Sequence, residues 1–189
     1  THSIGPFEVK HMAAFYRRHG VGEAMLPILS DRRVTYSSGV PELPQSISRI
    51  RPGATISLGG HDWRAIAGYG HTQEHLAFYC EALRVLISGD MLLPKISTNV
   101  NVWPIDPTAD AVGMFLDSLD EFAELPDETL VLPSHGLPFR GIRVRVRSLH
   151  EHHKARMAEL VEALDTPKTA YEILPVLFRR PLDNHQTFF

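Results

Sequence analysis

Residues 70–90 read GHTQEHLAFYCEALRVLISGD. Two histidines beside a glycine are followed by two apolar runs, LAFYC and RVLIS, and the stretch ends on Gly-Asp. Short apolar runs that are bounded by turn residues predict buried β-strands. A further run of this kind, TLVLP at 129–133, is followed by Ser-His-Gly. The polar residues that come directly after these strands are therefore the first candidates for a functional site.

The rest of the sequence predicts more strands and several helices. TISL (55–58) and DWRAIAG (62–68), joined by Gly-Gly, predict a β-hairpin. Helical spacing predicts a helix around HMAAFYRRHG, a long helix from Ile142 and a short one over TAYEILPVLF. The long helix has a packing stripe, formed by Ile142, Val146, Leu149, His153, Met157, Leu160 and Leu164. Another helix is predicted to begin at Asp106-Pro107, with a buried face formed by Val112, Phe115, Leu116, Leu119 and Phe122. Together these elements predict an α/β protein.

Composition limits the class of protein. The 189 residues are 43% hydrophobic, which is enough for one core with room for a small appendage. A formal net charge of -3 gives no overall field that would attract nucleic acid or anionic membranes. The single cysteine, Cys80, excludes an intramolecular disulfide and is expected to be a buried thiol. No apolar stretch approaches the roughly 18 residues that span a bilayer. We therefore expect a soluble, cytoplasmic protein without membrane contacts.

Three polar residues after strands are potential metal ligands. His71 follows the strand at 62–68, Asp90 follows RVLIS and His135 follows TLVLP. In layered α/β proteins, ligands bind beyond the ends of strands, where rigid strands hold converging loops. Two imidazoles and a carboxylate suit zinc or iron, and a carboxylate can bridge two ions. Taken singly, each residue is also compatible with a hydrogen-bonded histidine or a Gly-Asp turn.

The phrase GHTQEH, the SGD that follows one strand later and PSHG after a further helix and strand resemble the second half of metallo-β-lactamase fold hydrolases. The resemblance covers residues 50–140 by motif, and the tail from His150 resembles the helical, winged-helix-like extension of one branch. It implies part of a four-layer αββα sandwich with a C-terminal helical extension. On this resemblance, residues 1–141 are the C-terminal part of a metallo-β-lactamase-like domain and 142–189 are the extension, in truncated form.

The resemblance also implies a role for four residues. His71 would bind the first metal ion and His135 the second, while Asp90 would bridge both ions as the catalytic carboxylate. His75 would orient the neighbouring ligands through its ring nitrogens. The implied cofactors are two divalent ions, zinc first, with iron or manganese as alternatives. The Gln-Glu pair between the two histidines departs from the Pro-Gly often found there, and this departure concerns the subfamily.

A larger departure concerns the first metal motif of the family, His-x-His-x-Asp-His, which is absent from this sequence. Among the 11 histidines, only HEHH at 150–153 comes close. That stretch lies downstream of the other motifs and inside a predicted helix, where a solvated polar face is the expected role. We therefore expect the chain to be the C-terminal part of a longer hydrolase and to be inactive by itself. Weak or absent metal binding is expected as well, because three ligands are shared between two metal positions.

For the complete enzyme, the resemblance implies that a metal-bound hydroxide attacks a small-molecule substrate of the ester, thioester or lactone class. The loop after Asp90 and the residues after His135 would line the mouth of the site. The candidate substrate contacts are therefore Lys95, Asn99, Asn101, Trp103 and Arg140. Packing or solvation of a long loop explains these residues equally well. The oligomeric state is left open.

Two alternatives belong to other functional classes. The basic residues of RGIRVRVRSLHEHHKAR (140–156) could contact phosphates, as in a ribonuclease of the same superfamily or a non-catalytic binding module. On a helix these residues form a diffuse stripe, so nucleic-acid binding is not favoured. A serine hydrolase could use Ser134 beside His135, but the sequence has no Gly-x-Ser-x-Gly motif. Adjacent residues on a strand would also point to opposite faces of the sheet.

Overall fold

The structure is a computed structural model that describes residues 6–27, 45–178 and 180–182. Two compact units can be separated, one formed by Ser48–Lys154 and the other by Thr1–Ile47 together with Ala155–Phe189. The domain boundary at residue 142 that the sequence suggested differs from these bounds and stays a prediction. Residues 183–189 of the predicted extension lie outside the described part of the chain.

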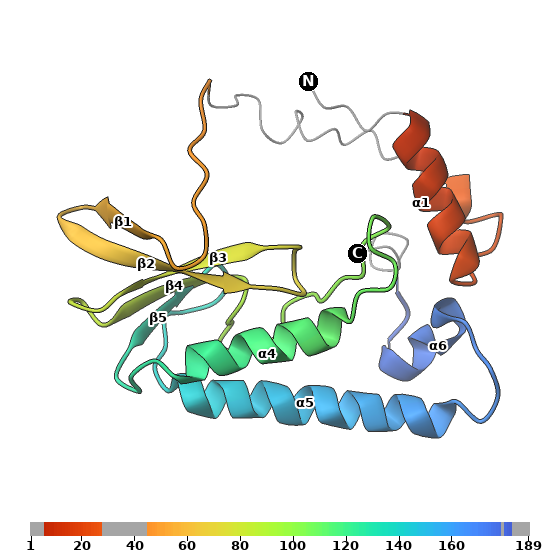
Figure 1. Cartoon of the computed structure of the whole chain (residues 1–189). Coiled ribbons are helices and arrows are strands. Elements are labelled where there is room, and N and C mark those ends of the chain that lie inside the picture. Colours follow the sequence, from red (N-terminus) through yellow and green to blue (C-terminus); the bar gives the residue numbers. More distant parts are fainter. Residues whose placement is uncertain (1–5, 28–44, 179, 183–189) are drawn as a thin grey trace. The chain divides into compact units, whose positions relative to one another are not determined.

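The unit Ser48–Lys154 is built on a five-stranded sheet whose strand order follows the sequence (Figure 1). The first four strands pair antiparallel, and the fifth pairs in parallel with the fourth. The second, fourth and fifth strands therefore run in the same direction, and their carboxyl ends meet at one edge of the sheet. The strands, all of them predicted, are β1 (Thr55–Leu58), β2 (His61–Gly68), β3 (His75–Cys80), β4 (Val85–Gly89) and β5 (Leu130–Pro133).

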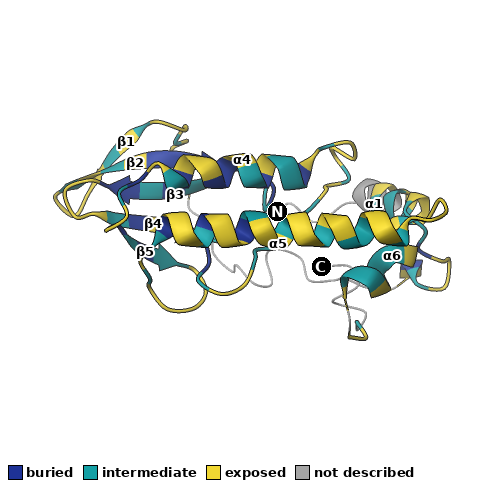
Figure 2. Cartoon of the chain, turned by 90° about the horizontal axis from the view of Figure 1, so that it is seen from below, coloured by how far each residue is buried: buried dark blue, intermediate teal, exposed yellow. Residues whose placement is uncertain are grey.

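Two helices, α4 (Ala111–Ala123) and the first part of α5 (Ile142–Ala163), cover one face of this sheet (Figure 2). Large side chains of both helices and of the sheet form the core, among them Ile66, Leu86, Phe115, Leu119, Phe122, Val131, Ile142, Val146 and Leu149. The predicted inner face of α4 is confirmed for Phe115, Leu119 and Phe122, which are buried, and for Leu116, which packs against the core. Cys80 is buried and unbridged, as predicted.

The start of α4 corrects one prediction. The helix begins at Ala111 rather than at Asp106-Pro107. Asp110 is the residue that caps it, because its carboxylate accepts a hydrogen bond from the Gly113 N–H at 2.9 Å. Aspartate is a common capping residue, so Asp106 and Asp110 were both suitable by residue type. Only the hydrogen bond from the first turn of α4 shows that Asp110 is the cap.

The sheet is also apolar on the face turned away from α4 and α5. The strand register places Ala65, Phe78, Ile87 and Leu132 in one row across β2, β3, β4 and β5. Ile87, inside this row, is 39% exposed. A sheet with apolar side chains on both faces is typical of proteins in which both faces are covered.

The second unit combines α1 (Pro6–Arg18), the last part of α5 and α6 (Ala170–Leu177). A small cluster of Val21 and Leu26 packs with Tyr16, Met25 and Tyr171. The predictions of α1 and α6 are confirmed. No helix in the described part of the chain combines the length and the apolar character needed to cross a membrane.

Candidate metal centre

His71, Asp90 and His135 lie together just beyond the carboxyl ends of β2, β4 and β5. Nε2 of His71 is 3.6 Å from Oδ2 of Asp90, and Nε2 of His135 is 3.3 Å from Oδ1. Two imidazoles therefore face the two oxygens of one carboxylate. The common direction of the three strands explains this convergence, since each ligand candidate follows a strand that ends at the same edge. The role of the three residues as metal ligands stays a prediction.

The backbone around Asp90 is fixed by its neighbours. Gly89 has a φ of +54°, and a Cβ at this position would lie 2.5 Å from the His75 ring. The Asp90 N–H points to Nε2 of His75 at 3.4 Å, and the Ser134 hydroxyl donates to Oδ1 of Asp90 at 2.5 Å. The next residues, Met91 and Leu92, are buried. Asp90 is thus held from its backbone, its side chain and the segment that follows it.

His75 is placed behind Asp90, as expected of a residue that orients a ligand. Burial lowers the pKa of His75, and the nearby charge of His71 lowers it further, while Asp90 acts in the opposite direction. Because Nε2 accepts from the Asp90 amide, the proton of the neutral ring is on Nδ1. This Nδ1 is buried and has no hydrogen-bond partner among the described atoms. His75 is therefore a neutral acceptor at this position.

The ring of His71 is held by the loop that follows Asp90. Its Nδ1 lies 2.9 Å from the carbonyl oxygen of Asn99 and 3.1 Å from the Thr98 hydroxyl. A carbonyl oxygen can only accept, so Nδ1 carries the proton, and Nε2 presents a lone pair towards Asp90. Asn101 adds two contacts, from its N–H to the Gly70 carbonyl at 2.9 Å and from its side-chain amide to the His71 carbonyl at 3.4 Å.

Helix α4 supports the start of the same loop. Gly70 has a φ of +89°, and a Cβ there would lie 2.5 Å from the Ala111 carbonyl and 2.7 Å from Cβ of Phe115. Only glycine permits this close approach. The Tyr69 N–H donates to the Ser118 hydroxyl at 3.0 Å. The end of β2 is thereby packed directly against α4 before the chain reaches His71.

His135 belongs to a loop that returns to β5, since Val131 and Phe139 form an isolated β-bridge. The Ser134 N–H donates to the Gly89 carbonyl at 3.1 Å, and Ser134 and His135 both contact Oδ1 of Asp90. The sequence-based argument that these neighbours point to opposite faces is wrong, because both residues follow the strand instead of lying in it. Ser134 nevertheless donates to a carboxylate and not to an imidazole base, which gives the serine hydrolase alternative no support.

The three candidate ligands form only part of a metal site. In the described part of the chain, no group of three or more His, Cys, Asp or Glu side chains could hold one ion. The reason is that His71 and His135 face different oxygens of Asp90, so each prospective position has one imidazole and one carboxylate oxygen. The lone pair of His71 Nε2 and the carboxylate are both acceptors, and a cation between them would satisfy both. The described residues thus supply about half of the ligands that each of two zinc or similar divalent ions would need.

Two of the predicted substrate contacts line a small pocket beside His71. Its volume is about 160 Å³, and Asn101 and Trp103 form part of its wall. Sequence analysis missed two other lining residues, Met114 and Thr72, whose hydroxyl is buried without a partner among the described atoms. The lining also includes Gly70, Gln73, Asp106, Ala109 and Ala111.

The remaining predicted contacts lie elsewhere. Asn99 offers its backbone carbonyl to His71, so its described contact supports the ligand candidate. Lys95 and Arg140 are exposed and do not line that pocket.

Two polar residues of α5 were also missed. The Arg145 guanidinium donates to the carbonyls of Leu93 at 2.6 Å and Ile96 at 2.8 Å. His153, which the sequence placed both on the packing stripe of the helix and in the solvated HEHH face, is partly buried beside Ser97. The spacing of these residues could have indicated their position. Residues 145, 149 and 153 are spaced by four, so Arg145 and His153 lie on the same side of the helix as the buried Leu149.

Three of the six Arg and Lys residues in 140–156 are used within the fold. Arg143 pairs with Asp127 at 2.7 Å, Arg156 pairs with Glu159 at 2.6 Å, and Arg145 binds backbone carbonyls. Nucleic-acid binding stays an alternative prediction. Three of the basic side chains proposed to contact phosphates already bind groups of the protein itself.

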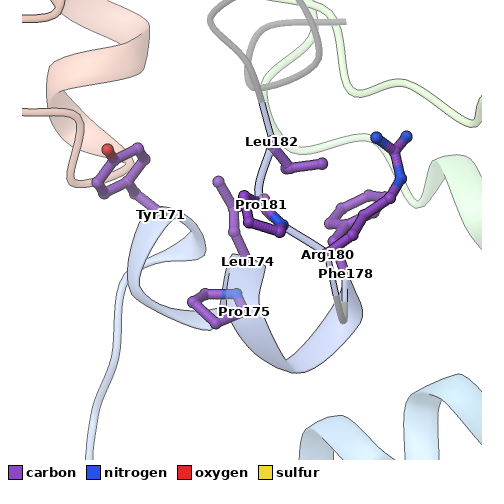
Figure 3. Close-up of a pocket in the computed structure, with 7 residues that line it drawn as sticks. All are labelled: Tyr171, Leu174, Pro175, Phe178, Arg180, Pro181 and Leu182. Carbon is purple, nitrogen blue, oxygen red and sulfur yellow. The ribbon is translucent and has the colours of Figure 1, made fainter.

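A larger pocket of about 480 Å³ lies in the second unit (Figure 3). It is lined by Tyr171, Leu174, Pro175, Phe178, Arg180, Pro181 and Leu182. This lining contains no carboxylate, histidine or cysteine, so the pocket offers no metal ligands of the usual kinds.

Comparisons with known proteins agree with the fold. The chain matches the metallo-beta-lactamase superfamily over residues 5–135 and the metallo-beta-lactamase-like C-terminal domain over residues 157–189. A crystal structure of a beta-lactamase domain protein from Burkholderia ambifaria is 42% identical, with a TM-score of 0.77 over 92% of this chain and 50% of that chain. For a metallo-beta-lactamase family protein from Thermus thermophilus, the identity is 32% and the TM-score 0.75, over 97% of this chain and 56% of that one.

Curated relatives include metallo-hydrolases. The probable metallo-hydrolase YqjP of Bacillus subtilis is 27% identical over 68% of this chain and 41% of its own length. A hydroxyacylglutathione hydrolase of Roseobacter denitrificans is 30% identical over 49% of this chain and 34% of its own length. The chain thus spans less than half the length of these relatives. The predicted fold class is confirmed by the five-stranded sheet with its helices and by the two similar crystal structures.

Proposed function

This chain belongs to the metallo-β-lactamase superfamily, and we propose that it supplies the half of a hydrolase active site that is centred on Asp90. The proposed substrate of the full-length protein is a small-molecule ester, thioester or lactone. One observation carries the proposal. Asp90 directs each of its two carboxylate oxygens at a different histidine Nε2, at 3.6 Å and 3.3 Å. A carboxylate shared in this way suits a bridge between two divalent ions.

On this proposal His71 would hold one ion, His135 would hold the other, and Asp90 would be a ligand of both. Two zinc ions are proposed, with iron or manganese as alternatives that accept the same donors. When bound, the ions would supply Lewis-acid polarisation of the substrate carbonyl and activation of a water molecule. The chain's own residues act by positioning, since Ser134 restrains Asp90 and the Asn99 carbonyl fixes the proton of His71 on Nδ1.

The other ligands of both ions are proposed to come from protein outside this sequence. Each position has two ligands here, whereas zinc usually has three or four, including water at catalytic sites. Two observations support this part of the proposal. The chain spans about half of the similar crystal structures, and its sheet is apolar on the face away from the helices. The isolated chain is accordingly proposed to be inactive.

The pocket beside His71 is the proposed place for part of the substrate. Trp103 and Met114 would contact an apolar group, while Asn101 and the unpaired Thr72 hydroxyl would bind a polar one. A thioester is the first choice among the substrate classes because one curated relative is a hydroxyacylglutathione hydrolase. Lys95, Asn99 and Arg140 remain proposed contacts at the mouth of the site.

A matched set of small esters, thioesters and lactones tests the proposal on the metal-loaded full-length protein. We expect one class to be hydrolysed, with thioesters first. The Asp90→Asn variant should lose on the order of 100-fold or more in kcat/KM, because it replaces the charge that both ions share. Hydrolysis that is unaffected by this substitution would contradict the proposal. A salt-dependent affinity for RNA, together with cleavage of RNA, would favour the ribonuclease alternative instead.

A further inference from the structure

The loop that holds His71 is itself held by helix α5. This loop, named the ligand loop here, comprises residues 91–101 and contains no regular secondary structure. Its first residues, Met91 to Leu93, are buried, whereas the stretch from Lys95 onward is only partly buried or exposed. Apolar packing therefore anchors the start of the loop, and Val100 packs against the core near its end. Polar contacts hold the stretch between these two points.

Arg145 supplies the first of these contacts. Its Nε donates to the Leu93 carbonyl at 2.6 Å, and its Nη2 donates to the Ile96 carbonyl at 2.8 Å. A guanidinium has several donors in one rigid plane, so a single side chain binds two carbonyls that are three residues apart. The loop therefore leaves the core in a direction that is set by α5.

His153, two helical turns further along α5, supplies the second contact. Its Nε2 lies 3.0 Å from the Ser97 hydroxyl, whose proton is directed at the Thr98 carbonyl at 3.2 Å. With that proton used, the Ser97 oxygen accepts from the Nε2–H of His153. The His153 ring packs edge-on against Phe115, with centroids 5.5 Å apart. Burial lowers the pKa of His153, and the neighbouring His152 and His150 lower it further, which favours the neutral ring.

The residues directly after Ser97 are those that bind His71. The Thr98 hydroxyl and the Asn99 carbonyl both lie within 3.1 Å of His71 Nδ1. Three consecutive residues, 97–99, thus connect the imidazole of His153 to that of His71.

Two neutral forms of His71 compete at this position. With the proton on Nδ1, the ring donates to Asn99 and keeps a lone pair on Nε2. With the proton on Nε2, the ring would point that proton towards Asp90 Oδ2, 3.6 Å away, and could not bind a metal through this nitrogen. The Asn99 carbonyl, 2.9 Å from Nδ1, favours the first form because it can only accept, whereas the Thr98 hydroxyl can pair with either form.

We propose that His153 and Arg145 are positioning residues that hold the ligand loop so that Asn99 keeps the proton of His71 on Nδ1. Neither residue contacts the carboxylate or the prospective substrate pocket. Their effect on a metal ion rests on the proposed role of His71 as a ligand. Their effect on the ring proton does not, because the tautomer of His71 can be measured in the metal-free chain.

The test compares His153→Leu, which removes the donor, with His153→Gln, which keeps an N–H group on a side chain of similar length. His152→Leu, an exposed neighbour on the same helix, is the matched control. ¹⁵N NMR of histidine-labelled chain, recorded well above the usual histidine pKa, reports which ring nitrogen of His71 carries the proton. We expect Nδ1–H in the unmodified chain, His153→Gln and His152→Leu, and a shift towards Nε2–H in His153→Leu.

Cobalt(II) affinity of the full-length protein gives the second readout. We expect a loss of about 10- to 100-fold in His153→Leu and recovery in His153→Gln, the range found when partners of metal-binding histidines are removed. Ser97→Ala removes the same hydrogen bond from the loop side and should shift the tautomer in the same direction, so the test does not depend on the folding of one helix variant.

The outcomes separate this inference from the proposed function. An unchanged His71 tautomer in both His153→Leu and Ser97→Ala overturns the positioning role, whatever the protein hydrolyses. A shifted tautomer in a protein whose metal binding does not depend on His71 supports the positioning role and overturns the proposed function.

Discussion

Two loops bring a histidine to Asp90, and they are supported in different ways. The side chain of His71 is 24% exposed, and its ring and backbone are held by Thr98, Asn99 and Asn101. The side chain of His135 is 69% exposed, and its described contact is with Asp90. The chain therefore preorganises the His71 side of the candidate centre, whereas the His135 side has room for further ligands or substrate. Preorganisation of one side favours metal binding there first.

The largest expected difference between the two loops is in the stability lost when a glycine of each loop, Gly70 or Gly136, is replaced by alanine. Gly70→Ala should destabilise the fold by about 3 kcal/mol, because the new Cβ would lie 2.5 Å from the Ala111 carbonyl in addition to the strain of φ +89°. Gly136→Ala should cost about 1–2 kcal/mol, since its φ of +87° is similar but the nearest atoms belong to the Pro94 ring. Urea unfolding of both variants measures the difference.

Gly141→Ala is the matched control for this pair. Its φ is +88°, and no atom lies within 4 Å of the added Cβ, so the substitution reports the backbone strain alone. A Gly70→Ala variant no less stable than Gly141→Ala would show that α4 does not fix the start of the His71 loop.

A smaller effect is expected from the histidines themselves in the metal-free chain. His71→Ala should lower the free energy of unfolding by about 1–2 kcal/mol, because it removes the hydrogen bond to the Asn99 carbonyl and a side chain that is only 24% exposed. His135→Ala should change it by less than about 0.5 kcal/mol, as is usual for exposed side chains. Equal effects in urea unfolding would argue against the difference between the loops.

The smallest effect concerns pH. His75 and His153 both support the His71 side, and burial lowers the pKa of each. As the pH falls below the unfolded value of about 6.5, the unfolded chain takes up protons that the folded chain resists, so stability falls. The stability that the two neutral rings contribute is therefore fully present above about pH 6.5. It is lost as the pH falls towards the lowered pKa values of His75 and His153 in the folded chain.

Urea midpoints measured between pH 7.5 and 5 test this expectation. His153→Gln should flatten part of the decline, because it removes the partly buried imidazole whose pKa is lowered. A decline that is identical in the unmodified chain and His153→Gln would remove His153 from the explanation.

The difference between the loops also shows what the sequence could predict. The placement of His71, Asp90 and His135 beyond strand ends was predicted from three apolar runs. The shared direction of their strands, which brings the three residues to one edge, is known from the structure. The partners of His71 could not be predicted in this way. They lie 27 and 28 residues away in the sequence, in a loop that no hydrophobic pattern describes.

Helix α5 illustrates a second limit. Its apolar stripe predicted one packing face, and Ile142, Val146 and Leu149 are indeed buried. Met157 and Leu164 continue the same spacing but are 45% exposed each. Periodicity identifies the side of a helix that is apolar, but the extent of its burial depends on which other elements reach it. His153 lies where the buried part of this stripe ends, which is why it is only partly buried.

The proposal that Asp90 is a ligand of two metal ions is tested most directly by elemental mass spectrometry. The measurement determines zinc, iron and manganese in the full-length protein. The unmodified protein should contain close to two metal ions per chain, and a variant with both Asp90→Ala and His135→Ala should contain almost none, because both positions lose a ligand. Retention of both ions in this double variant would contradict the assignment of Asp90 and His135 to the metal centre.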